Sequence, residues 1–111
     1  MRVISQDGTM DVPYEISSFS MAVGKYENVE HAVIFCYNYS TSIGTKMAEY
    51  GSKEKAKKAM ETLRIAYENN EFYHHTGNSE LFAEVYHTLS QEEFNERMSE
   101  YFQFPTDEEL G

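Results

Sequence analysis

The sequence predicts an α+β domain, in which a small antiparallel sheet built from N-terminal hairpins is followed by about three helices packed on one face of that sheet. Residues 1–50 contain short strand-forming runs separated by turn residues, whereas residues 52–102 carry apolar side chains at steps of three and four. The length of 111 residues is typical of one domain. We therefore expect a single domain over 1–111, mainly strands to residue 50, mainly helices over 52–102, and a solvated tail over 103–111.

The chain opens with a predicted hairpin. Residues 3–5 and 9–12 are short strand-forming runs, and between them the pair Asp7-Gly8 supplies the positive φ that tight turns require. Pro13 lacks a backbone N–H group, so the second strand either ends there or lies at the edge of a sheet.

A second hairpin and a further strand follow. Residues 18–23 alternate polar and apolar side chains at their start, and a polar connection leads to residues 31–37, which predicts two paired strands. The run from 33 to 37 is apolar throughout, which predicts a central strand covered on both faces. Residues 43–50 predict one more strand before the helices begin.

From Ser52 onward the apolar period becomes helical. Ser52 is a suitable N-cap, and the predicted apolar face of the first helix consists of Ala56, Ala59, Met60, Leu63 and Tyr67. A second helix is expected after Ser79. A third opens with a capping box over 90–93 and ends before Pro105. Its predicted apolar face consists of Phe94, Met98, Tyr101 and Phe102.

Charge divides the chain into two unequal halves. Residues 1–65 hold eight acidic and eight basic residues, whereas residues 66–111 hold eleven acidic residues and one base, Arg97, and so carry the whole net charge of −10. Binding to duplex DNA or RNA needs a basic field that releases counterions from phosphates, so direct nucleic-acid binding is not expected. No apolar run is long enough to cross a membrane, and the single Cys36 suits a reducing cytoplasm.

The motifs of common enzyme and metal sites are missing from the sequence. His74, His75 and His87 lack the spacing that gathers metal ligands, and we expect them to be solvated. Cys36 is flanked by aromatic residues and has no recognisable base, so it is expected to be a small buried side chain. The sequence contains no phosphate-binding glycine loop. We expect neither enzymatic activity nor a cofactor.

Two features leave functional alternatives open. The chain has nine tyrosines and seven phenylalanines, which serve either as core and interface residues or as surfaces on which a nucleobase stacks. The acidic half serves either solubility or the binding of a basic protein partner. The aromatic content exceeds what one thin sheet and three helices can cover. We therefore expect a homo-oligomer, most simply a two-fold dimer, through Phe94, Met98, Tyr101 and Phe102.

Three segments resemble a group of small proteins encoded in prophages and mobile elements of Firmicutes. These segments are MRVISQDGTMDVPYE (1–15), YGSKEKAKKAMETLR (50–64) and FQFP (102–105) with acids after it, and they cover about a third of the chain. The chain is also similar to the Thoeris anti-defence sponge proteins. These are phage proteins that sequester cyclic ADP-ribose signals without cleaving them.

The resemblance implies an anionic, adenine-bearing ligand in the cytoplasm of a bacterial host. Such a ligand, of the cyclic ADP-ribose or cyclic oligonucleotide type, requires guanidinium donors and an aromatic surface. The expected ligand-binding residues are Arg64, Arg2, Tyr50 and Arg97. For Arg64, a ligand contact and a purely structural role covering the sheet with its aliphatic stem are both open, and Arg97 also suits an ion pair with a nearby glutamate.

Two other functions compete with this one. The first is an acidic inhibitor similar to an anti-CRISPR protein, which binds a basic nucleic-acid-binding surface of a host defence protein. The second is a structural or regulatory phage accessory protein without a role in defence.

Overall fold

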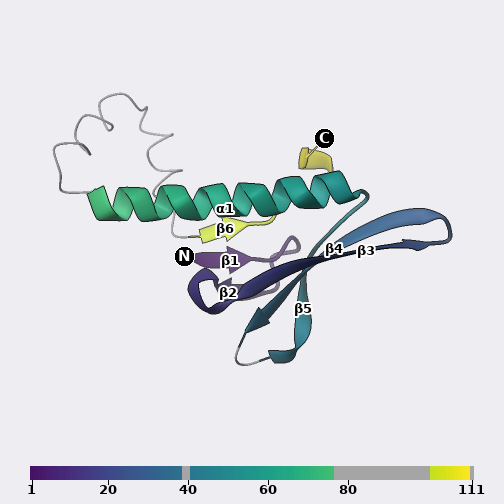
Figure 1. Cartoon of the computed structure of the whole chain (residues 1–111), viewed down its shortest axis with the longest axis horizontal. Coiled ribbons are helices and arrows are strands. Elements are labelled where there is room, and N and C mark those ends of the chain that lie inside the picture. The colour runs from purple at the N-terminus through teal and green to yellow at the C-terminus, as the bar shows by residue number, and fades with distance from the viewer. Residues whose placement is uncertain (39–40, 77–100, 111) are drawn as a thin grey trace.

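The structure is a computed structural model that describes residues 1–38, 41–76 and 101–110, without the side chains of 41–43 and 73–76. It contains two three-stranded sheets and one α-helix within those residues. Figure 1 shows α1 running along one side of the molecule, with β6 and β1 beneath it. The elements in chain order are β1 (Arg2–Ile4), β2 (Asp11–Pro13), the 3-10 helix η1 (Tyr14–Ile16), β3 (Ser18–Tyr26), β4 (Val29–Asn38), β5 (Thr41–Tyr50), α1 (Lys53–Thr76), β6 (Tyr101–Gln103) and the 3-10 helix η2 (Glu108–Leu110).

The predicted fold class is wrong. In place of one antiparallel sheet under about three helices, the described chain is mostly sheet with a single helix. The second predicted helix and most of the third fall on residues 77–100, which lie outside the described residues. The end of the third is a strand, β6, because Tyr101 and Phe102 pair with β1.

The first sheet has the order β2-β1-β6. Strands β1 and β2 form the predicted antiparallel hairpin, and Gly8 has the expected positive φ of 78°. Strand β2 ends at Pro13 and also lies at the edge, as the missing N–H group requires. Strand β6 pairs with β1 in parallel, and Phe104 continues this pairing by donating its N–H to the carbonyl oxygen of Ile4 at 3.1 Å.

The second sheet is an antiparallel meander, β3-β4-β5. It confirms the predicted second hairpin, which turns through Glu27 and Asn28 at positive φ, and the predicted strand that follows. Strand β4 is central, with Ala32, Ile34 and Cys36 buried on one face. On its other face the side chain of Tyr37 is 43% exposed, so the prediction of cover on both faces is wrong for the described part.

Helix α1 begins as the sequence predicts. The hydroxyl of Ser52 accepts a hydrogen bond from the N–H of Lys55 at 3.2 Å, which is N-cap geometry. Its buried side chains recur at steps of three, four and seven and pack toward β4 and β5. These residues are Ala56, Ala59, Leu63 and Asn70.

Gln6 joins the two sheets and the C-terminal segment. Its backbone N–H donates to the carbonyl oxygen of Met47 at 2.7 Å, and its side-chain amide donates to the carbonyl oxygens of Glu49 and Pro105. The prediction of a solvated tail over 103–111 is therefore wrong for part of this segment. Phe104 is fully buried, and Asp107 forms an ion pair with Lys55 at 2.8 Å.

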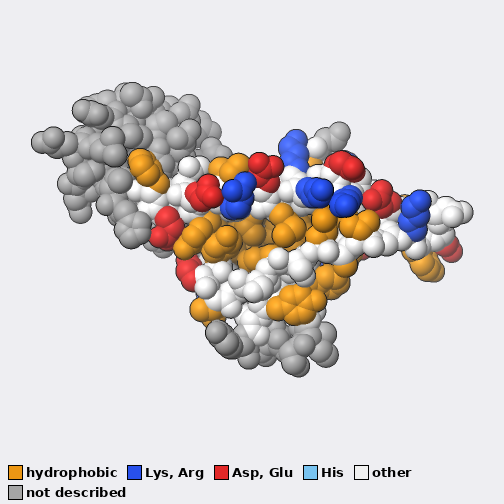
Figure 2. Space-filling view, viewed as in Figure 1, with side chains coloured by type: hydrophobic (Ala, Val, Ile, Leu, Met, Phe, Trp, Pro, Cys, Tyr) orange, Lys and Arg blue, Asp and Glu red, His pale blue; other side chains and the backbone are white. Residues whose placement is uncertain are grey.

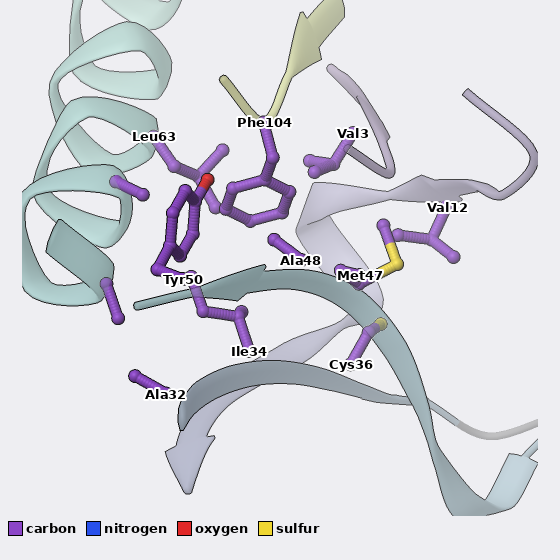
Figure 3. Packing of buried hydrophobic residues seen from close by; sticks show 12 residues of the cluster. Val3, Val12, Ala32, Ile34, Cys36, Met47, Ala48, Tyr50, Leu63 and Phe104 are labelled. Atoms are coloured by element: carbon purple, nitrogen blue, oxygen red, sulfur yellow. The ribbon is translucent and has the colours of Figure 1, made fainter. Parts of the chain in front are cut away.

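The core lies between the second sheet and the layer formed by α1 and the N- and C-terminal segments. In Figure 3, Tyr50, Leu63 and Phe104 lie together beside the helix, whereas Val3, Val12 and Met47 gather at the other end of the cluster. The aromatic rings of Phe102 and Phe104 meet edge to face at 5.4 Å between centroids. The core therefore contains residues from the N-terminal hairpin, the second sheet, α1 and the C-terminal segment.

No helix within the described residues is long and apolar enough to cross a membrane.

Candidate functional site

A groove of about 810 Å³ lies between the start of β3 and the middle of α1. This volume is within the range of small-molecule sites. We call it the tyrosine-arginine groove. The residues that line it are Tyr14, Glu15, Ser17, Phe19, Met60, Glu61, Leu63, Arg64 and Tyr67.

Two stacked tyrosines form one wall of the tyrosine-arginine groove. The rings of Tyr14 and Tyr67 lie 4.1 Å apart between centroids at an interplanar angle of 25°, and Phe19 stacks on Tyr14 at 6.0 Å. Tyr14 is held there because its N–H donates to the carbonyl oxygen of Met1. Burial, together with the carboxylates of Glu71 and Glu15, raises the pKa of Tyr67, so its phenol stays protonated near neutral pH.

Arg64 is the basic residue of this groove. Because it precedes Tyr67 by three residues on α1, both side chains lie on the same side of the helix. Its guanidinium is 60% exposed and lies 3.8 Å from the carboxylate of Glu61 and 3.4 Å from that of Glu68. Exposed ion pairs of this kind contribute about 0–1 kcal/mol each to stability. A ligand can therefore replace either carboxylate as the partner of Arg64 with little loss of stability.

The side chains that line the groove include two carboxylates and one base. Glu15 and Glu61 are both lining residues, and Arg64 is the single lining base. The amino group of Met1 forms an ion pair with Glu15, and this hydrogen bond lowers the pKa of the Glu15 carboxyl. Figure 2 shows how basic and acidic side chains alternate along the helix, with a band of hydrophobic side chains beneath them. The surface of α1 is therefore of mixed charge.

The structure does not bring the predicted ligand-binding residues together. Arg64 lines the groove, but Arg2 forms an ion pair with Asp11 on the first hairpin at 2.7 Å and is not a lining residue. Tyr50 is only 1% exposed, and its hydroxyl donates to the carbonyl oxygen of Pro105 at 2.8 Å, so its ring offers no surface for stacking. Arg97 lies outside the described residues.

The predicted interface is only partly described. Phe94 and Met98 lie outside the described residues. Tyr101 is 65% exposed, whereas Phe102 is half-buried against the core and packs on Phe104. Residues 77–100, also outside the described part, contain six of the eleven acids on which binding to a basic partner would depend.

Metal and thiol chemistry finds little support in the described part. Those residues contain no group of three or more His, Cys, Asp or Glu side chains close enough to hold a metal ion. His87 and the side chains of His74 and His75 lie outside that part. Cys36 is buried on β4, which agrees with its predicted role as a small core side chain.

Sequence reasoning missed most of this groove. Tyr67 was expected only on the apolar face of the helix, and Tyr14 and Phe19 were not expected at a site. The spacing of Arg64 and Tyr67 on one helix was a usable signal. Tyr14 and Tyr67 are far apart in the sequence, and no local pattern predicts that their rings stack.

No protein-family model, curated protein or solved structure significantly matches the chain.

Proposed function

We propose that this chain is a non-enzymatic phage or prophage anti-defence protein that sequesters a cyclic nucleotide-type immune signal in the tyrosine-arginine groove. The single observation that carries the proposal is the position of Arg64 beside the stacked rings of Tyr14 and Tyr67. An aromatic surface next to a guanidinium matches the two chemical parts of a nucleotide, its base and its phosphate.

The geometry defines how the base would bind. Because the two tyrosine rings are already in contact at 4.1 Å, a base has no space between them and stacks on the outer face of the pair. Stacking of one base on an aromatic side chain contributes about 1–3 kcal/mol. The hydroxyl of Tyr67 is already engaged with the carboxylate of Glu71, so Tyr67 contributes the face of its ring.

The phosphate would bind to Arg64. Its ion pairs with Glu61 and Glu68 are long and solvent-exposed, whereas a phosphate offers two oxygens to the guanidinium fork at once. Glu15 and Glu61 oppose a second negative charge in the same place. The groove therefore favours a ligand whose base provides most of the contact and whose phosphate binds at one point.

Titration calorimetry on the full chain tests this proposal with cyclic ADP-ribose isomers and cyclic di-AMP as probes. We expect one probe to bind stoichiometrically and to be recovered intact after heat denaturation of the protein. Arg64→Gln keeps the aliphatic stem and removes the charge, so it should weaken binding about tenfold or more. Tyr67→Leu should weaken binding by a similar factor, because it removes the stacking surface but retains apolar volume.

Lys57→Gln is the matched control, because Lys57 is an exposed basic residue of the same helix that does not line the groove. It should bind the probe as the unmodified chain does. Recovery of a cleaved probe would show an enzyme. Binding that is equal in Arg64→Gln and the unmodified chain would place the site elsewhere, and the absence of binding for every probe would refute the proposal.

A further inference from the structure

Within the described residues, strand β3 has an unpaired edge. It lies at one side of the β3-β4-β5 sheet, and among the described residues no strand pairs with its other side. Residues 18–24 of this strand contain neither a charged side chain nor a proline, and Lys25 next to the turn is its one charged residue. Natural edge strands are usually blunted by charge, proline, a bulge or a covering element, so a long uncharged edge is suited to pair with another strand.

The turn that closes the hairpin shows which backbone groups are available. Glu27 and Asn28 form a two-residue turn, so Tyr26 and Val29 beside it are a hydrogen-bonded pair. Hydrogen-bonded and non-hydrogen-bonded pairs alternate along an antiparallel ladder. Every second residue of β3 therefore directs its N–H and C=O groups away from β4. These residues are Phe19, Met21, Val23 and Lys25.

The side chains next to this edge allow a close approach. On the sheet face opposite the core, β3 carries four small residues, Ser18, Ser20, Ala22 and Gly24, and one large residue, Tyr26, which is next to the turn and would face the partner's Ser18. On the core face, α1 packs mainly against β4 and β5. A second strand can therefore lie beside β3 without displacing the helix.

We propose that β3 pairs antiparallel with β3 of a second copy of this chain, about a two-fold axis at Ala22, and that the second copy completes the tyrosine-arginine groove. This register matches all four outward-directed residues of each copy. Met21 faces the partner's Val23, and Phe19 faces the partner's Lys25. If the two-fold axis passed through Met21 instead, Lys25 would face the partner's Ser17, which lies beyond the end of the strand. The dimer would then have fewer hydrogen-bonded residue pairs.

The partner's Lys25 is the functional consequence of this register. Residues that face each other in an antiparallel pair direct their side chains to the same face of the sheet. Phe19 lines the tyrosine-arginine groove, so the partner's Lys25 lies on the groove side, next to it. This supplies a further cation to a groove in which Glu15 is paired with the Met1 amino group and Glu61 with Arg64. This step rests on the proposed function, whereas the strand pairing does not.

A cysteine pair tests the register directly. In the proposed dimer, Ala22 faces the partner's Ala22 as a non-hydrogen-bonded pair, with Cα atoms about 4.5 Å apart. That separation suits a disulfide. Ala22→Cys should therefore form a covalent dimer of twice 12.9 kDa under mild oxidation. Ser20→Cys is the matched control, because the two Ser20 residues lie about 14 Å apart along the paired strands and should not cross-link.

Light scattering on the unmodified chain should give the dimer mass. Val23→Lys should shift it to the monomer mass, since it places a charge on the free edge. Val29→Lys, on the neighbouring strand, should remain dimeric and shows that an added lysine on this hairpin is tolerated. A monomer mass for the unmodified chain at all concentrations, or cross-linking of Ser20→Cys in place of Ala22→Cys, would overturn the proposal.

Binding measurements separate the two proposals. Lys25→Gln should remain dimeric and weaken binding of the nucleotide probe about tenfold. Full probe affinity in a dimeric Lys25→Gln variant would refute the role of the partner's Lys25. If no probe binds the unmodified chain, the proposed function fails, while the cross-linking result still decides the strand pairing.

Discussion

The hydroxyl of Tyr50 donates a 2.8 Å hydrogen bond to the carbonyl oxygen of Pro105, across 55 residues of sequence. The same carbonyl oxygen accepts a second hydrogen bond from the side-chain amide of Gln6 at 3.1 Å. These three residues come from the N-terminal hairpin, the end of β5 and the C-terminal segment. Three parts of the chain that are far apart in sequence therefore meet at this position.

Tyr50→Phe should reduce the free energy of unfolding by about 0.5–1.5 kcal/mol, the usual net contribution of one hydrogen bond. The loss stays moderate because Gln6 continues to satisfy the carbonyl oxygen of Pro105. Urea unfolding measures this change. In the Gln6→Ala background, Tyr50→Phe should reduce the free energy of unfolding by more, because the carbonyl oxygen of Pro105 then loses both side-chain partners. Additive effects would contradict a shared acceptor.

Asp107→Asn should make stability less sensitive to acid. The carboxylate of Asp107 accepts hydrogen bonds from Lys55 and from the N–H of Gly51, and these contacts lower its pKa. Because the pKa is lower in the folded than in the unfolded state, the stabilisation is complete above the unfolded value of about 3.9. It is lost as the pH falls through the folded value.

Urea midpoints between pH 6 and pH 2.5 test this prediction, and the midpoint should decline less in Asp107→Asn than in the unmodified chain. Some decline should persist in both, since the pKa values of Asp7 and Glu15 are also lowered, that of Asp7 to about 2. Glu108→Gln, an exposed neighbour, serves as the control and should match the unmodified chain. Equal slopes in all three proteins would exclude this role for Asp107.

Phe104→Ala should destabilise the protein by about 3–5 kcal/mol, the range for removal of a buried aromatic side chain. The ring is 1% exposed and meets Phe19 and Phe102 edge to face. Since small domains have a total stability of about 5–15 kcal/mol, this loss should be visible as a large fall in the melting temperature. Ile16→Ala, at a position 54% exposed, should change stability by about 0.5 kcal/mol or less.

Gly44→Ala should destabilise the protein by about 1 kcal/mol, because an added Cβ would lie 2.7 Å from the ring of Tyr37. The ring of Tyr37 is partly exposed and can turn outward, which limits the effect. A double-mutant cycle with Tyr37→Ala measures the contact. In the Tyr37→Ala background the glycine substitution should have no destabilising effect, and an undiminished loss there would assign it to the strand backbone.

Local sequence signals predicted those parts of the fold that local chemistry determines. The Asp7-Gly8 turn, the hairpin that closes at Glu27 and Asn28, and the helix that begins after Ser52 follow from neighbouring residues. Strand β6 does not. Tyr101 and Phe102 continued a helical spacing that included Phe94 and Met98, and only pairing with β1 makes this segment a strand. Such pairing is a long-range contact that a local period cannot show.

The candidate site divides in the same way. Arg64 was predicted and lies in the tyrosine-arginine groove, but no local sequence pattern predicts that Tyr14 lines the same groove. Tyr50 was predicted as a ligand-binding residue, yet its position at the end of β5 directs the ring into the core. The charge of Arg64 was visible in the sequence. Its surroundings depend on how η1 and α1 pack.

The parallel pairing of β1 with β6 also affects synthesis on the ribosome. Gln6 and Pro105 are hydrogen-bonded although they are 99 residues apart in sequence, and Phe104 enters the core beside Val3. A nascent chain can form both antiparallel hairpins and α1 early, but their apolar faces stay incompletely covered until residue 104 has left the exit tunnel. During that interval the nascent chain exposes apolar surface to which chaperones can bind. A product of translation that stalls before Phe104 should therefore be degraded rapidly by proteases.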